Sequence, residues 1–142
     1  MLMKIPPIIS PELIKTLMEM GHGDELVLGD GNFPAASLAK RLVRCDGHNV
    51  PDLLDAILQL FPLDAYVEHP VMLMDTGPGE ARPEIWARYE EIVAKNGGTA
   101  EQVTYLERFE FYERAKQAYA VVATGETAIY ANIILKKGVV TV

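Results

Sequence analysis

Apolar residues recur along the chain at spacings that predict helices alternating with short strands. In residues 11–20 the apolar positions fall on one face of a helix, at Leu13, Ile14, Leu17 and Met18. Ser10 suits the N-cap of this helix, and Pro11 suits its first turn. Gly21 suits its end, because glycine readily adopts the left-handed conformation that follows many helices.

The alternation of helices and strands continues along the whole chain. Further helices are predicted to begin near Pro34, Val50, Pro83 and Phe109. Apolar runs between the helices predict strands at residues 25–29, 41–45, 71–74, 103–106, 119–124 and 129–136. The last two strands are predicted to lie on either side of a turn at Gly125-Glu126.

Strands that alternate with helices predict an α/β layer fold with a mainly parallel central sheet, covered by helices on both faces. The continuous apolar run from Val71 to Met74 is typical of a strand that is buried on both sides. The chain contains no internal repeat, low-complexity segment or linker. Residues 1–142 are therefore predicted to form a single domain.

Composition and charge narrow the class of protein. Apolar residues make up 49% of the chain and charged residues 23%, as in ordinary globular domains. The net charge is −7, without a run of Lys or Arg, which argues against nucleic-acid binding. No apolar run reaches the ~18 residues of a membrane span. Cys45 is the sole cysteine, so the chain forms no internal disulfide, and we expect a cytoplasmic protein.

His22 is the first candidate for chemistry. It lies between Gly21 and Gly23, which allow a sharp bend of the backbone, and Asp24 and Glu25 follow it. Neighbouring carboxylates can hold one tautomer of an imidazole and favour its charged form. An ordinary imidazole pKa of about 6.5 suits proton transfer at neutral pH. By local sequence alone, His22 could equally be a surface or packing residue.

Asp30 comes directly after the predicted strand 25–29. In an open α/β sheet, the carboxyl end of a strand is where ligands bind. Asp30 follows His22 by eight residues, so both side chains could serve one small polar ligand. Asp30 could instead cap the helix that follows. The segment 29–34 is similar to a dinucleotide fingerprint, but Pro34 replaces its third glycine, which excludes that interpretation.

A second polar cluster lies in the last third of the chain. Arg108 follows the predicted strand 103–106 and could donate to ligand oxygens, or pair with a neighbouring glutamate. Tyr130 and Asn132 lie two residues apart in a predicted strand and should face the same side. Together they offer a phenol and an amide, which are groups that typically bind ligand hydroxyls, although an ordinary amphipathic strand would show the same pattern.

Metal binding is a weaker possibility. His22, Asp24 and Asp30 could supply ligands, as could His48 and His69. No pair of these histidines has helical spacing, and none has a cysteine partner.

Several of these motifs resemble the L-fucose mutarotase family, whose sister branch is D-ribose pyranase. The similar segments include Glu19-Met20-Gly21-His22-Gly23-Asp24-Glu25, Phe33-Pro34-Ala35, Phe111-Tyr112-Glu113-Arg114-Ala115, Tyr130-Ala131-Asn132-Ile133 and Leu135-Lys136-Lys137-Gly138. The resemblance extends from about Ile5 to Gly138. The block around His22 and the block around Tyr112 are specific only when they occur together.

The resemblance implies an enzyme that interconverts the α and β anomers of a free monosaccharide, most readily L-fucose. It implies that His22 is the proton donor, and that the sugar is contacted by Asp30, Arg108, Tyr130, Ala131 and Asn132. The family forms ring-like homo-oligomers, commonly decamers of two stacked pentamers with sites near subunit boundaries. The resemblance implies no metal or organic cofactor.

Some questions stay open at the level of sequence. The chain departs from the family pattern at Gly31, Asn32 and Ala131, so the preferred sugar is not determined. The group that removes the anomeric proton could be Asp30, Tyr130 or a water. A non-catalytic monosaccharide-binding or regulatory module would use the same pocket, and a metal-dependent isomerase is the least favoured alternative.

Overall fold

The computed structural model describes residues 1–142 and contains six strands in one sheet. The strands are β1 (Glu25–Gly29), β2 (Leu42–Cys45), β3 (Val71–Met74), β4 (Val103–Leu106), β5 (Ala120–Thr124) and β6 (Ile133–Lys136). The helices are α1 (Pro11–Glu19), α2 (Ala35–Leu38), α3 (Val50–Leu58), α4 (Glu84–Lys95) and α5 (Arg108–Gln117), with a 3-10 turn, η1 (Ala100–Gln102). None of the helices combines the length and hydrophobicity that a bilayer crossing needs.

The sheet has the strand order β2-β5-β1-β6-β3-β4. Strand β5 runs parallel to β1 and β2, and β3 runs parallel to β4. Strand β6 is antiparallel to both of its neighbours, β1 and β3. The prediction of a mainly parallel sheet is confirmed. The last two strands do not pair across the Gly125-Glu126 turn, however, because β1 lies between them.

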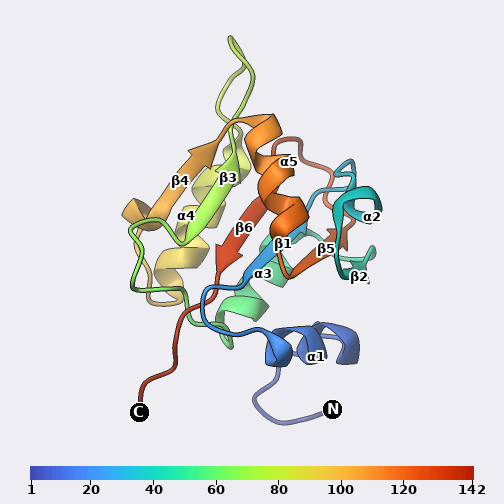
Figure 1. Cartoon of the computed structure of the whole chain (residues 1–142), viewed down its shortest axis with the longest axis vertical. Coiled ribbons are helices and arrows are strands. Elements are labelled where there is room, and N and C mark those ends of the chain that lie inside the picture. Colours follow the sequence, from blue (N-terminus) through green and yellow to red (C-terminus); the bar gives the residue numbers. More distant parts are fainter.

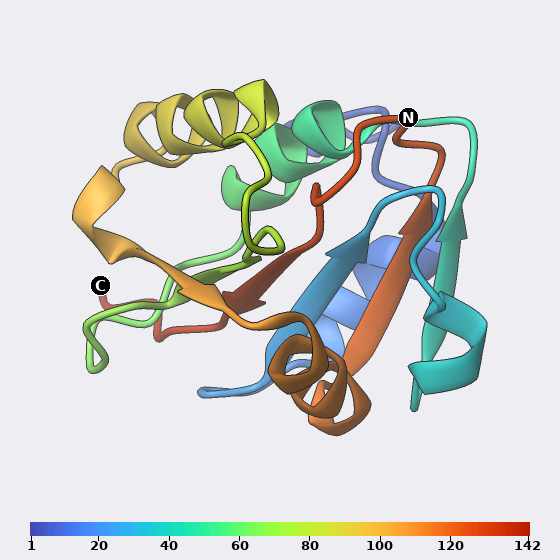
Figure 2. The ribbon, with the colours of Figure 1, turned by 90° about the horizontal axis from the view of Figure 1, so that it is seen from above.

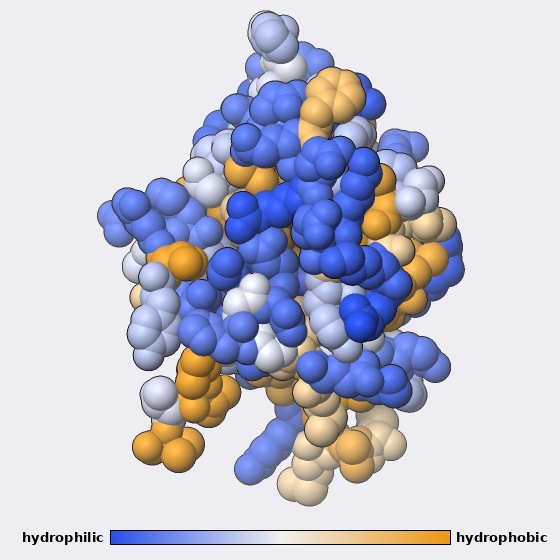
Figure 3. Space-filling model, viewed as in Figure 1, coloured by the Kyte–Doolittle hydropathy of each residue, from blue (hydrophilic) through white to orange (hydrophobic).

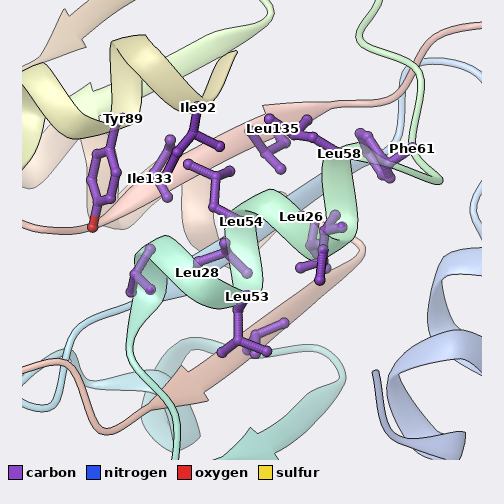
Figure 4. Close-up of a cluster of buried hydrophobic side chains, with 14 of the residues drawn as sticks. Leu26, Leu28, Leu53, Leu54, Leu58, Phe61, Tyr89, Ile92, Ile133 and Leu135 are labelled. Carbon is purple, nitrogen blue, oxygen red and sulfur yellow. The ribbon is translucent and has the colours of Figure 1, made fainter. Parts of the chain in front are cut away.

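Helices cover both faces of the sheet, as predicted (Figures 1 and 2). Alternate residues of a strand point to opposite faces, so Leu26 and Leu28 join one cluster of buried side chains while Val27 joins the other. The larger cluster lies beneath α3 and α4, and part of it is drawn in Figure 4. The smaller cluster lies beneath α5 and includes Phe111 and Ala115.

Two helices begin at capping side chains, and Ser10 has the N-cap role that the sequence predicts. The Ser10 hydroxyl accepts the backbone N–H of Leu13 at 3.1 Å. In the same way, the Asn49 side chain accepts the N–H of Asp52 at 2.9 Å. The helix predicted from Pro34 is real but consists of only four residues, Ala35–Leu38.

The last strand is shorter than predicted. It begins at Ile133 rather than at residue 129, because Tyr130 has a φ of +52° and turns the chain. A left-handed residue of this size cannot continue a strand. Residues 129–132 therefore form a bent segment that leads into β6, and the side chains of α4 hold this segment in place.

Candidate functional site

A cavity of about 350 Å³ opens at the carboxyl ends of β1 and β3. Its lining consists of Asp30, Asn32, Phe33, Met74, Glu80, Arg108, Tyr112, Ile129, Tyr130 and Asn132. Its lining includes Met74 at the end of β3 and Glu80 in the β3–α4 loop, which projects from the end of the sheet in Figure 1. The volume suits a small ligand, and four of the predicted site residues converge here.

Asp30 is almost completely buried at the end of β1. One carboxylate oxygen accepts the N–H of Asn32 at 3.0 Å, and the other accepts the N–H of Ala131 at 3.4 Å. Burial raises the pKa of Asp30, and these backbone N–H groups oppose that change. Asp30 does not cap α2, whose N-cap is Pro34. Each carboxylate oxygen retains capacity for a ligand hydroxyl.

The segment from Tyr130 to Asn132 is anchored by two side chains of α4. The indole N–H of Trp86 donates to the Tyr130 carbonyl at 2.8 Å. The Tyr89 hydroxyl donates to the Ala131 carbonyl at 2.7 Å. Burial raises the pKa of the Tyr89 phenol, so it remains a donor at any physiological pH. These two bonds hold Tyr130 in its left-handed conformation, which a tyrosine would otherwise rarely adopt.

Two of the three predicted residues of this segment line the cavity, and the third lies in the core. Tyr130 and Asn132 both line the cavity, although a bend rather than the predicted strand brings them there. The Asn132 amide oxygen accepts the N–H of Asp30 at 2.7 Å, while its nitrogen meets only the weak acceptor Met74 Sδ at 3.7 Å. The Ala131 side chain is buried in the core and does not line the cavity; only its backbone contacts Asp30.

Arg108 is the first residue of α5 and lies at the rim of the cavity. Its Nε donates to the Tyr112 hydroxyl at 3.1 Å, and its guanidinium lies 5.4 Å from the Tyr112 ring centroid. It makes no ion pair with Glu107, whose carboxylate instead accepts the N–H of Phe109 at the start of the helix. The remaining guanidinium donors can therefore turn toward ligand oxygens.

His22 lies at the opposite end of β1. The next residue, Gly23, has the sharp bend that the sequence predicts, with a φ of +86°, and its N–H donates to the Lys137 carbonyl beyond the end of β6. Asp30, by contrast, contacts Asn132 before the start of β6. The rise along a strand places His22 roughly 20 Å from Asp30. One chain therefore does not bring the two side chains to the same ligand.

The partner of His22 is Asp64, which the sequence analysis missed. His22 Nε2 lies 3.1 Å from Asp64 Oδ1, and Asp64 also accepts the N–H of Tyr66 at 3.0 Å. The N–H of Tyr66, and then His22, lower the pKa of the buried Asp64 carboxyl. An ionised Asp64 carboxylate can only accept a hydrogen bond, so His22 Nε2 carries the proton that lies between them. Nδ1 is then the ring nitrogen that can exchange a proton with a ligand.

The neighbouring carboxylates do not have the predicted role. Asp24 accepts the backbone N–H of Gly21 at 2.7 Å, and Glu25 forms a forked ion pair with Arg114. No periodic pattern marks Asp64, which follows His22 by 42 residues. Its only signal is a single carboxylate between the apolar residues Leu63 and Ala65.

The candidate metal ligands do not converge. No group of three or more His, Cys, Asp or Glu side chains is close enough to hold a metal ion. His48 and His69 also take no part in the cavity. Each lies in a different loop, and His69 contacts the Glu101 carbonyl.

Comparison with known proteins matches residues 3–140 to the RbsD / FucU transport protein family. This chain belongs to that family. The L-fucose mutarotase of Haemophilus influenzae (strain PittGG) is 53% identical over 140 residues, which cover 98% of this chain and 97% of that protein. The family expected from the sequence motifs is thus confirmed.

Solved structures of the RbsD / FucU family agree with this fold. The fucose mutarotase of Streptococcus pneumoniae, in complex with L-fucose, is 57% identical with a TM-score of 0.96, over 99% of this chain and 100% of that one. The Bacillus subtilis RbsD, complexed with D-ribose, is 26% identical with a TM-score of 0.72, over 98% and 100%. The chain therefore resembles the fucose protein more closely than the ribose protein.

Loss of the Tyr89 hydroxyl should destabilise the protein. In Tyr89→Phe the buried carbonyl of Ala131 loses its donor, so we expect the free energy of unfolding to fall by about 1–3 kcal/mol. Urea unfolding followed by circular dichroism measures this change. Tyr66→Phe is the control, because Tyr66 is exposed and its hydroxyl has no hydrogen-bond partner. Equal stability of the two variants would contradict the anchoring role of Tyr89.

Proposed function

We propose that this protein is a mutarotase that interconverts the α and β anomers of a free monosaccharide, with L-fucose as the preferred sugar. The observation that carries the proposal is the full-length match to the Streptococcus pneumoniae protein, which holds L-fucose. The cavity supports it, because it combines a carboxylate, an amide, a phenol and a guanidinium around a space of sugar size. These groups are suited to fixing hydroxyls in defined orientations.

The chemistry needs two proton transfers. Ring opening delivers one proton to the ring oxygen and removes another from the anomeric hydroxyl. In this proposal His22 supplies the first proton, and Asp64 stabilises the charged imidazole that does so. Asp30, Arg108 and Asn132 orient the sugar. Because free sugars already mutarotate slowly in water, positioned acid and base groups need to remove only a few kcal/mol of barrier.

The distance between His22 and the cavity supports a site that two copies complete. We propose a homo-oligomer, a decamer of stacked rings, in which His22 of one copy meets the cavity of the next. Apolar side chains are exposed at the end of the molecule that carries His22, among them Met1, Leu2, Met3, Val139, Val140 and Val142. Figure 3 shows apolar residues at this lower end, below a largely hydrophilic face. Such a surface suits contact with further copies.

The proposed reaction uses only protein side chains. Each step moves a proton, so neither a metal nor an organic cofactor is required. We also place the protein in the cytoplasm. Its one cysteine, Cys45, is a buried free thiol, which suits a reducing compartment.

The first test is NMR saturation transfer between the α and β anomeric signals of L-fucose. Exchange should appear only with protein and should be faster than with D-ribose or D-galactose. His22→Ala should abolish it, because no other group is proposed to protonate the ring oxygen. Undiminished exchange in a folded His22→Ala protein would contradict the assignment of His22. Line broadening without exchange in the native protein would indicate a sugar-binding module instead.

Mixed oligomers test whether two copies share a site. His22→Ala and Asp30→Ala should each be inactive alone. Subunits mixed by co-expression should recover about a quarter of native activity, because that share of interfaces pairs an intact His22 with an intact Asp30. No recovery in mixed oligomers of native mass, confirmed by light scattering, would mean that each site is built within one chain.

The Asp64 carboxylate should be needed for rapid exchange. Asp64→Asn keeps the size and one acceptor but removes the charge that stabilises the imidazolium of His22. We expect the exchange rate to fall about tenfold or more. Asp46→Asn makes the same chemical change at an exposed residue that pairs with Arg44, and it should exchange at the native rate. A native rate in Asp64→Asn would exclude this role.

A further inference from the structure

A tight turn in the β3–α4 loop presents Glu80 to the cavity. The N–H of Glu80 donates to the Gly77 carbonyl at 3.2 Å, which closes a four-residue turn over Pro78 and Gly79. Gly79 has a φ of +79°. Proline in the second position and a left-handed glycine in the third define a type II turn. This loop projects beyond the sheet in Figure 1, and Glu80 lines the cavity beneath it.

Glu80 is in direct contact with Tyr130. The Tyr130 hydroxyl donates to Glu80 Oε1 at 3.0 Å. A Cβ atom at Gly77 would lie 3.2 Å from this carboxylate oxygen and 3.6 Å from the Tyr130 hydroxyl. The absence of a side chain at Gly77 thus leaves room for the pair. Glu80 and Tyr130 are 50 residues apart in sequence, so two separate parts of the chain build this contact.

Tyr130 packs against both clusters of buried side chains and also lines the cavity. Its backbone is in a left-handed conformation that the Trp86 indole stabilises, and such strain in a bulky residue is typical of functional sites. Its hydroxyl donates to a carboxylate, so its lone pairs are free to accept a proton from a ligand hydroxyl. A phenol bound in this way can accept one proton as it passes its own to the carboxylate.

We propose that Glu80 takes up the proton of the anomeric hydroxyl through Tyr130. This inference rests on the proposed mutarotase function and identifies the base that the function requires. The hydroxyl proton moves to Tyr130 Oη, and the phenol proton moves to Glu80 Oε1. The freed electron pair forms the C=O of the aldehyde as the bond from C1 to the ring oxygen breaks. The ring oxygen takes a proton from His22 of a second copy, and ring closure reverses each step.

Glu80 suits this role better than Asp30 does. Both Asp30 oxygens already accept backbone N–H groups, from Asn32 and Ala131, which fix the carboxylate as an orienting group even though burial raises its pKa. The Glu80 carboxylate accepts one hydrogen bond, from Tyr130, and has capacity for a proton. Glu80 acts through Tyr130 and is a positioning and relay residue, whereas Tyr130 touches the sugar.

The test replaces Glu80 with an isosteric group that cannot take a proton. Glu80→Gln keeps an acceptor for the Tyr130 hydroxyl, so we expect an unchanged KM for L-fucose and an exchange rate at saturation about tenfold to a hundredfold lower. Glu91→Gln is the matched control, since Glu91 is exposed on α4 outside the cavity. Both variants should match the native protein in urea unfolding.

Rates in mixtures of H₂O and D₂O separate a relay from a merely structural contact. The native rate should fall along a curve as the deuterium fraction rises, because several protons move together. In Glu80→Gln and Tyr130→Phe fewer protons move together, so a plot of the residual rate against the deuterium fraction should be closer to a straight line. A native rate and native curvature in Glu80→Gln would overturn the relay while leaving the mutarotase intact. No exchange in the native protein would overturn the proposed function and the relay together.

Discussion

The joint between the end of β1 and the start of β6 is the contact on which the cavity depends. The N–H of Asp30 donates to the Asn132 side chain, and the N–H of Ala131 donates back to the Asp30 carboxylate. Because Asp30 is buried, the charge of its carboxylate depends on the N–H groups of Ala131 and Asn32, which donate to its two oxygens. The joint thus couples the ionisation of a ligand group to the path of the neighbouring backbone. Trp86 and Tyr89 then hold that path from the side of α4.

The fold was largely predictable because its determinants are local and periodic. Helix caps such as Ser10 and Asn49 act within one turn, and alternating burial marks strands such as β1. The start of β6 was not predictable in this way. The apolar character of Ile129 and Tyr130 suggests a strand, yet hydrogen bonds from a helix more than 40 residues away impose a bend. Tertiary contacts of this kind leave no trace in a local window.

In the candidate site, too, some residues could be predicted from the sequence and others could not. Asp30, Arg108, Tyr130 and Asn132 were named from the sequence and they do converge on one cavity. His22 and Asp30 were expected to meet because one short strand joins them, but a strand separates its ends rather than bringing them together. Asp64 and Glu80 could not be predicted as site residues, because each acts through a contact that only the folded chain creates. Charged residues in loops carry no periodic signal, whatever their function.

The order of the strands has a consequence for how the chain folds as it is synthesised. Strands β5 and β6 come last in sequence, yet each is inserted between strands made earlier. Until residues 120–136 have left the ribosome, β1 has neither of its neighbours, and β2 has none. Only β3 and β4 can pair before then. The nascent chain therefore exposes unpaired strand edges until β5 and β6, the last strands to be made, complete the sheet.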